Sequence, residues 1–69
     1  MPLDVKITEL TAIAASVAAN CLPCLKYHHA KAKEAGCSKD EIEDAIRVAN
    51  MVKQQPAKHM QELVQELLK

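Results

Sequence analysis

Pro23 lies between two cysteines and restricts the local backbone more than any other residue of the chain. Proline has no backbone N–H and clashes with the preceding helical turn, so it is disfavoured inside a helix but accepted in the first turn. A helix arriving from the N-terminal side should therefore end near Asn20, a residue suited to a left-handed exit. The next helix should begin near Pro23. This places the Cys21-x-x-Cys24 motif at a helix N-terminus.

The flanking segments have the periodicity of amphipathic helices. Apolar residues recur at helical spacing over residues 4–19, and Asp4 is the predicted N-cap. Glu9 is the one acidic residue in the body of this helix, and apolar positions surround it in helical space. The helix that starts near Pro23 is expected to run to about Ala35, because Gly36 suits the position after a helix end.

A capping-box pattern of Ser38 and Glu41 predicts the start of a third helix. Gln54 and Gln55 interrupt its apolar stripe, and Pro56 is suited to open a fourth helix. We therefore predict one all-α domain over residues 1–69 with about four short helices. Two stripes are expected to face the core or a subunit interface: Ile42, Ala45, Ile46, Ala49 and Val52 in the third helix, and Met60, Leu63, Val64, Leu67 and Leu68 in the fourth.

Composition excludes some classes of function. Nine basic residues balance nine acidic ones, which gives no electrostatic argument for binding nucleic acid or an anionic membrane. A chain of 69 residues buries a modest core, so we expect a homo-oligomer. The N-terminus lacks the pattern of a signal peptide, and no apolar run is long enough to span a bilayer. The expected location is the cytoplasm, where a close cysteine pair is more often catalytic or metal-binding than structural.

The two thiols and a nearby histidine suggest redox chemistry. A helix N-terminus stabilises an anion and lowers the pKa of a thiol placed there. His28 follows Cys24 by one helical turn, so it can share a face with Cys24 and take its proton. The helix dipole instead favours Cys21, which is nearer the helix end. We favour Cys24 as the attacking thiol and Cys21 as its resolving partner.

Zinc is the competing interpretation. A structural zinc site needs four ligands, and Cys21, Cys24 and His28 supply three. His29, His59 or Cys37 would have to supply the fourth, because the chain has no second pair of this spacing. The alternative function is a non-enzymatic helical binding module that holds zinc through these residues. Cys37 is otherwise expected to be a simple buried thiol.

The spacing around the cysteine pair resembles a known family. Glu9 precedes Cys21 with eleven residues between them, three residues separate Cys24 from His28, and Gly36 lies eight residues after the histidine. This pattern, E-x₁₁-C-x-x-C-x₃-H with the later glycine, resembles the alkylhydroperoxidase D (AhpD-like) branch of the carboxymuconolactone decarboxylase superfamily. The resemblance covers about residues 6–52.

The resemblance implies an all-α, oligomeric, thiol-dependent peroxidase or disulfide reductase without a cofactor. It implies that Glu9 holds or deprotonates His28, that His28 activates Cys24, and that the oxidised Cys24 condenses with Cys21. A dihydrolipoyl group or a thioredoxin-like protein would then reduce the disulfide. One departure is the Leu22-Pro23 spacer, because some AhpD enzymes have a histidine there. The decarboxylase branch works without the cysteine pair, so that activity is not expected.

The link from Glu9 to His28 is the demanding part of this prediction. Glu9 lies about 16 Å of helix before Asn20, whereas His28 lies only about 8 Å into the next helix. A strictly antiparallel hairpin would not bring them level. A crossing angle, a bend or a neighbouring subunit would be required.

Overall fold

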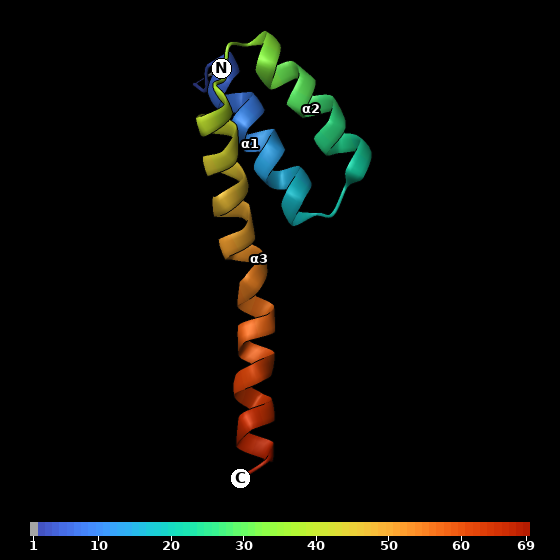
Figure 1. Ribbon diagram of the computed structural model, residues 1–69, viewed down its shortest axis with the longest axis vertical. Helices are drawn as coiled ribbons and strands as arrows, with labels where there is room; N and C mark the ends of the chain where they lie inside the picture. Colours follow the sequence, from blue (N-terminus) through green and yellow to red (C-terminus); the bar gives the residue numbers. More distant parts are fainter. Residues whose placement is uncertain (1) are drawn as a thin grey trace.

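The computed structural model describes residues 2–69 and, over that range, contains three helices: α1 (Val5–Ala18), α2 (Leu22–Glu34) and α3 (Lys39–Leu67). Residues 2–69 form no strand, so the all-α prediction is confirmed. Figure 1 shows α1 and α2 as a hairpin beside the first half of α3, while the rest of α3 extends alone to the C-terminus. The molecule is accordingly elongated, with extents of 52 × 23 × 23 Å.

Local capping interactions fix the ends of α1. The Asp4 carboxylate accepts a hydrogen bond from the backbone N–H of Ile7 at 2.8 Å, which satisfies one of the free donors of the first turn. At the other end Asn20 has a φ of +56°, the left-handed conformation that ends a helix. The backbone N–H of Cys21 then bonds to the carbonyl of Ser16 at 3.0 Å. Both predicted ends of α1 are confirmed.

The turn between α2 and α3 is fixed in the same way. Gly36 has a φ of +89°, a conformation that side chains strongly disfavour. Ser38 Oγ accepts the N–H of Glu41 at 3.1 Å, and the Glu41 carboxylate accepts the N–H of Ser38 at 2.8 Å. This reciprocal pair is the capping box that the sequence predicts.

The core lies where α1 meets both other helices. Ile13 of α1 and Ala32 of α2 are completely buried, and Ile42 of α3 and the thiol of Cys37 join them. Ala32 has no side chain beyond Cβ, so it allows close approach of α2 to α1. The cluster is small, and α1 is the element that connects it to both neighbours.

The predicted break between a third and a fourth helix is absent. α3 runs without interruption from Lys39 to Leu67 and contains Pro56 in its interior. A proline there costs about 3 kcal/mol because it removes one hydrogen bond and crowds the preceding turn. A break would have left a new helix without a Ser, Thr, Asp or Asn cap, because Gln54 and Gln55 precede the proline. Continuing the helix keeps the other backbone hydrogen bonds.

The two halves of α3 have different surroundings. Residues 2–53, here called the head, contain every buried side chain described above. Residues 54–69, here called the arm, are all exposed. Over residues 2–69, no helix combines the length and the apolar character that crossing a bilayer requires.

Candidate active site

The two cysteines form a disulfide at the start of α2. Cys21 is the N-cap of the helix, Cys24 lies in its first turn, and their Cα atoms are 5.2 Å apart. The backbone N–H of Cys24 points to Cys21 Sγ at 3.3 Å. Cys24 is exposed, whereas Cys21 is partly buried. The predicted placement of the motif at the start of the second helix is confirmed.

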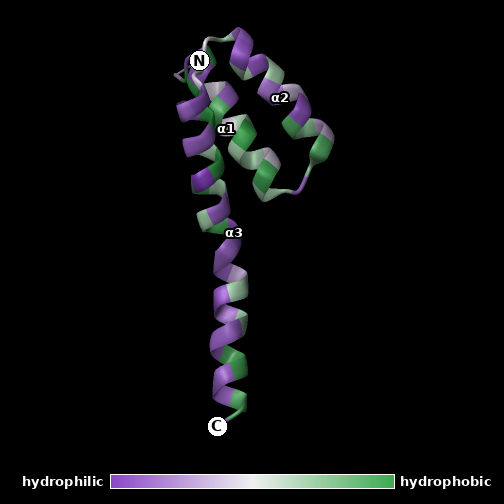
Figure 2. Cartoon of the chain, in the orientation of Figure 1, coloured by the Kyte–Doolittle hydropathy of each residue, from purple (hydrophilic) through white to green (hydrophobic). Residues whose placement is uncertain are grey.

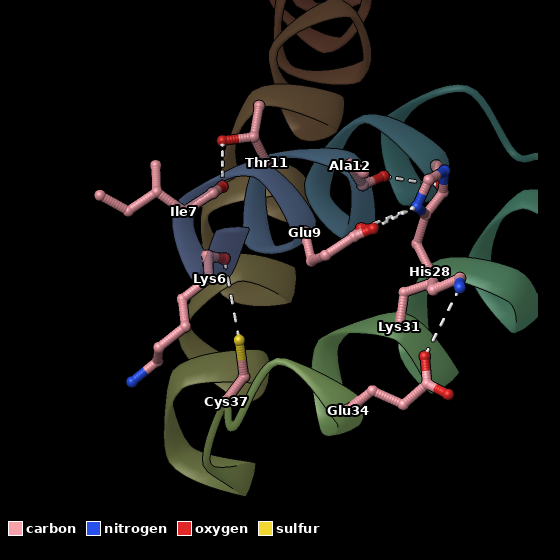
Figure 3. A network of polar contacts seen from close by, with 10 residues as sticks. Lys6, Ile7, Glu9, Thr11, Ala12, His28, Lys31, Glu34 and Cys37 are labelled. Carbon is pink, nitrogen blue, oxygen red and sulfur yellow. Dashed lines mark hydrogen bonds and ion pairs between the residues drawn. The ribbon is translucent and has the colours of Figure 1, made fainter. Parts of the chain in front are cut away.

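Glu9 and His28 meet across the interface of α1 and α2. His28 Nδ1 lies 3.2 Å from Glu9 Oε1 and 3.3 Å from Oε2, and Figure 3 shows the two side chains pointing toward each other. The Glu9 side chain is only 12% exposed and that of His28 is 30% exposed. The contact lies within one chain, so no neighbouring subunit is needed to bring the two residues together.

This contact defines the state of the histidine. An ionised carboxylate only accepts hydrogen bonds, so the Nδ1 that faces Glu9 carries the hydrogen. In the neutral ring Nε2 is then the nitrogen that can accept a proton. Tyr27 packs edge-on against the imidazole, with the ring centroids 5.0 Å apart, and further restricts its orientation.

His28 and the disulfide border the same cavity. Its volume is about 300 Å³, and Cys21, Cys24 and His28 form one side of it. The α1 side of the cavity is made of small side chains: Ala12, Ala15, Ser16 and Ala19. Small residues here leave space next to the sulfur atoms. Three of the four predicted site residues thus share a cavity, and Glu9 is attached to them through His28.

The model of the carboxymuconolactone decarboxylase family matches residues 2–65. The chain belongs to this family. The match covers the whole head and most of the arm. No curated protein and no solved structure matches the chain.

Ser16 also lines the cavity beside the disulfide, and the sequence prediction missed it. It is only 5% exposed, and its hydroxyl donates to the carbonyl of Ala12 at 2.7 Å. The spacing could have identified it, because Ser16 follows Glu9 by seven residues, about two helical turns, and therefore lies on the same helix face. It is also the only polar residue between Ala12 and Ala19.

The remaining candidate metal ligands do not gather at the disulfide. His29 and Cys37 border a separate cavity of about 430 Å³ beside α3, and His59 lies in the arm. Cys37 is buried with Sγ 3.7 Å from the carbonyl oxygen of Lys6. Residues 2–69 contain no group of three or more His, Cys, Asp or Glu side chains arranged to hold a metal ion. The four-ligand zinc site is therefore not assembled within the described chain.

Proposed function

We propose that this protein is an AhpD-like thiol–disulfide oxidoreductase that reduces hydroperoxides. The observation that carries the proposal is the contact of Glu9 with His28 on the cavity that contains the Cys21–Cys24 disulfide. The carboxylate, imidazole and two thiols are the groups that a thiol peroxidase needs, and the family includes AhpD-like proteins. We place the protein in the cytoplasm, where dithiol donors keep such a pair cycling.

The oxidative half-reaction begins with both cysteines reduced. His28 Nε2 takes the proton of the Cys24 thiol, and Glu9 stabilises the resulting imidazolium. The Cys24 thiolate attacks the terminal peroxide oxygen, the O–O bond breaks, and the leaving alkoxide takes the proton from His28. Cys24 is now a sulfenic acid. The Cys21 sulfur attacks it and forms the disulfide, and the Cys21 proton leaves with the hydroxyl as water.

The reductive half-reaction uses the unequal exposure of the two cysteines. A dithiol donor, such as a dihydrolipoyl group or a thioredoxin-like protein, attacks Cys24 because it is the more exposed residue of the pair. Cys21 leaves as a thiolate, which the N–H of Cys24 and the N-terminus of α2 stabilise. The second donor thiol then attacks the mixed disulfide and releases Cys24. Cys24 is therefore the cysteine that is attacked, and Cys21 is the leaving thiolate that the helix dipole stabilises.

A donor-coupled peroxidase assay tests the proposal. With hydroperoxide and a dihydrolipoyl donor, Cys24→Ser should lower turnover to the uncatalysed rate, and Cys21→Ser should lower it less, because the donor can reduce the Cys24 sulfenic acid directly. His59→Ala, in the exposed arm, is the control and should keep full activity. A monothiol probe, which has no second thiol to release Cys24, should form a stable mixed disulfide with peroxide-treated Cys21→Ser but not with Cys24→Ser. Unchanged activity in Cys24→Ser would contradict the mechanism, and one zinc ion per chain that is lost in Cys21→Ser would favour the metal-binding alternative.

A further inference from the structure

The wall that α1 contributes to the cavity beside the disulfide is apolar except at one position. Figure 2 shows the half of α1 that leads into the turn before α2 in the green shades of hydrophobic residues almost throughout. Of the four residues that α1 brings to this cavity, three are alanines and the fourth is Ser16. The hydroxyl of Ser16 is therefore the one polar side-chain group on this wall, and the residue is only 5% exposed.

This hydroxyl can act toward a molecule in the cavity as a hydrogen-bond acceptor. A serine hydroxyl has one hydrogen to donate and two lone pairs that accept. The hydrogen of Ser16 is committed to the carbonyl oxygen of Ala12 at 2.7 Å, a short bond on the same helix. The lone pairs of Ser16 Oγ remain, so a ligand that bonds to it has to supply the hydrogen.

His28 gives the opposite wall of the cavity a donor. Its Nδ1 lies 3.2 Å from Glu9 Oε1, so Nε2 is the nitrogen that holds the proton taken from the Cys24 thiol. One acceptor from α1 and one donor from α2 thus border the cavity that Cys24 also lines. A hydroperoxide has the matching groups, because its terminal oxygen carries a hydrogen and its inner oxygen can accept one.

We propose that Ser16 Oγ accepts the hydrogen bond of the hydroperoxide O–H group and so turns the terminal oxygen toward Cys24, an inference that rests on the proposed function. In the attack, the Cys24 sulfur bonds to the terminal oxygen and the O–O bond breaks. The inner oxygen leaves as an alkoxide and takes the proton from His28 Nε2. The hydrogen on the terminal oxygen stays there and becomes the hydrogen of the Cys24 sulfenic acid, so Ser16 transfers no proton.

Thr11 offers a matched comparison in the same helix. Its hydroxyl donates to the carbonyl of Ile7 at 2.8 Å, the same bond to the residue four positions earlier that Ser16 makes (Figure 3). Thr11 is exposed and does not border the cavity of the disulfide. A difference between variants at these two positions therefore reports the place of Ser16 in the cavity, since the bond to the backbone is common to both.

Single-turnover oxidation of the reduced chain by tert-butyl hydroperoxide tests the proposal. Acid quenching and mass spectrometry follow the loss of the Cys24 thiol. Ser16→Ala should lower the second-order rate constant by about 5- to 10-fold, the order expected for one lost hydrogen bond. Thr11→Val, which also removes a hydroxyl, should leave the rate constant unchanged. Ser16→Ala keeps the backbone carbonyl that accepts the N–H of Cys21 at 3.0 Å, so the turn before α2 is retained.

A second probe shows whether Ser16 acts on the substrate or on the thiol. Methyl methanethiosulfonate reacts with a thiolate but has no O–H or N–H group to donate. In a Cys21→Ser background, its rate constant with Cys24 should be the same with Ser16 and with Ser16→Ala at every pH from about 5 to 9. An equal loss with both probes would mean that Ser16 acts through Cys24 or His28, and it would overturn the proposal.

The outcomes also separate this proposal from the proposed function. Oxidation of the wild-type chain no faster than that of Cys24→Ser would overturn both. A wild-type rate that Ser16→Ala keeps in full would leave the peroxidase function standing and would overturn the role of Ser16 alone. A loss of the same size in Thr11→Val would assign the effect to α1 as a whole and would count against Ser16 as well.

Discussion

The head and the arm each contain a histidine beside a glutamate, but only the pair in the head belongs to the candidate site. His28 and Glu9 are 3.2 Å apart, come from two different helices and are largely covered. His59 and Glu62 are 3.6 Å apart, lie one turn apart on one helix, and have side chains 70% and 61% exposed. The packing of α1 on α2 therefore distinguishes the Glu9–His28 pair from the surface pair. An exposed ion pair of that kind contributes little to stability.

The apolar stripes give the same contrast. α3 carries apolar residues at helical spacing on both sides of Gln54 and Gln55, yet the first set packs on the hairpin through Ile42 and Ala49 and the second set is exposed. Helical periodicity identifies the face of a helix that will be buried, but it does not identify what buries it. Variants in the head and in the arm measure this difference directly.

The largest effect on stability is expected at the centre of the head. Ile13→Ala should lower the free energy of unfolding by about 2–5 kcal/mol, because Ile13 is completely buried and the substitution leaves a cavity. Leu63→Ala should cost less than about 1 kcal/mol at protein concentrations where the chain is monomeric, because the side chain is half exposed. Urea unfolding at low concentration measures both. Equal losses would contradict the distinction between head and arm.

A smaller effect is expected when the charge of Glu9 is removed. Glu9→Gln should lower the kcat of the peroxidase assay by about 10- to 100-fold, because the amide orients His28 without stabilising the imidazolium. The KM for peroxide should stay the same, because Glu9 acts through His28 and does not border the cavity of the disulfide. The matched control is Glu62→Gln, which removes the carboxylate of the exposed pair.

Two further measurements separate this positioning role from a general loss of structure. Glu9→Asp keeps the charge and should recover part of the activity. Nitrogen-15 spectra of neutral His28 should show the hydrogen on Nδ1 in the wild-type chain. A rise in KM with unchanged kcat in Glu9→Gln would indicate that Glu9 contacts substrate and would contradict the assigned role.

Local rules predicted the parts of the fold that depend on a few neighbouring residues. Asp4, Asn20, Gly36 and the capping box of Ser38 and Glu41 each satisfy free backbone groups at a helix end, so sequence alone located those ends. The same rules placed a break before Pro56, and there they were wrong. A proline weakens a helix but ends it only where another conformation offers better hydrogen bonds, and neither Gln54 nor Gln55 can cap a new helix.

The candidate site could be predicted less completely. The spacing of Glu9, Cys21, Cys24 and His28 named its residues, but helical offsets alone left the Glu9–His28 contact open between one chain and two. Only the packing of α1 on α2 determined it. Ser16 was missed because a serine in the middle of a helix usually donates to a carbonyl of the preceding turn, as Ser16 does to Ala12. That hydrogen bond forms at any face of a helix, so the serine alone does not indicate a cavity.

The smallest expected effect concerns Glu41, where the head fixes the start of α3. The hydrogen bond from the Ser38 backbone N–H, and then the contact with Lys6, lower the pKa of this carboxyl below its ordinary value of 4.5. A carboxyl whose pKa is lower in the folded state contributes stability above its unfolded pKa, and this contribution is lost as the pH falls through the folded pKa.

The stability advantage of the wild-type chain over Glu41→Gln should therefore be present at pH 6 and shrink as the pH is lowered past 4.5. Thermal unfolding at a series of pH values from 6 to about 3 measures it. Glu43→Gln is the control, since that carboxylate only meets Lys39 at 3.8 Å on the exposed face of the same helix. A difference between wild type and Glu41→Gln that did not change with pH would mean that the cap acts through its geometry alone, without its charge.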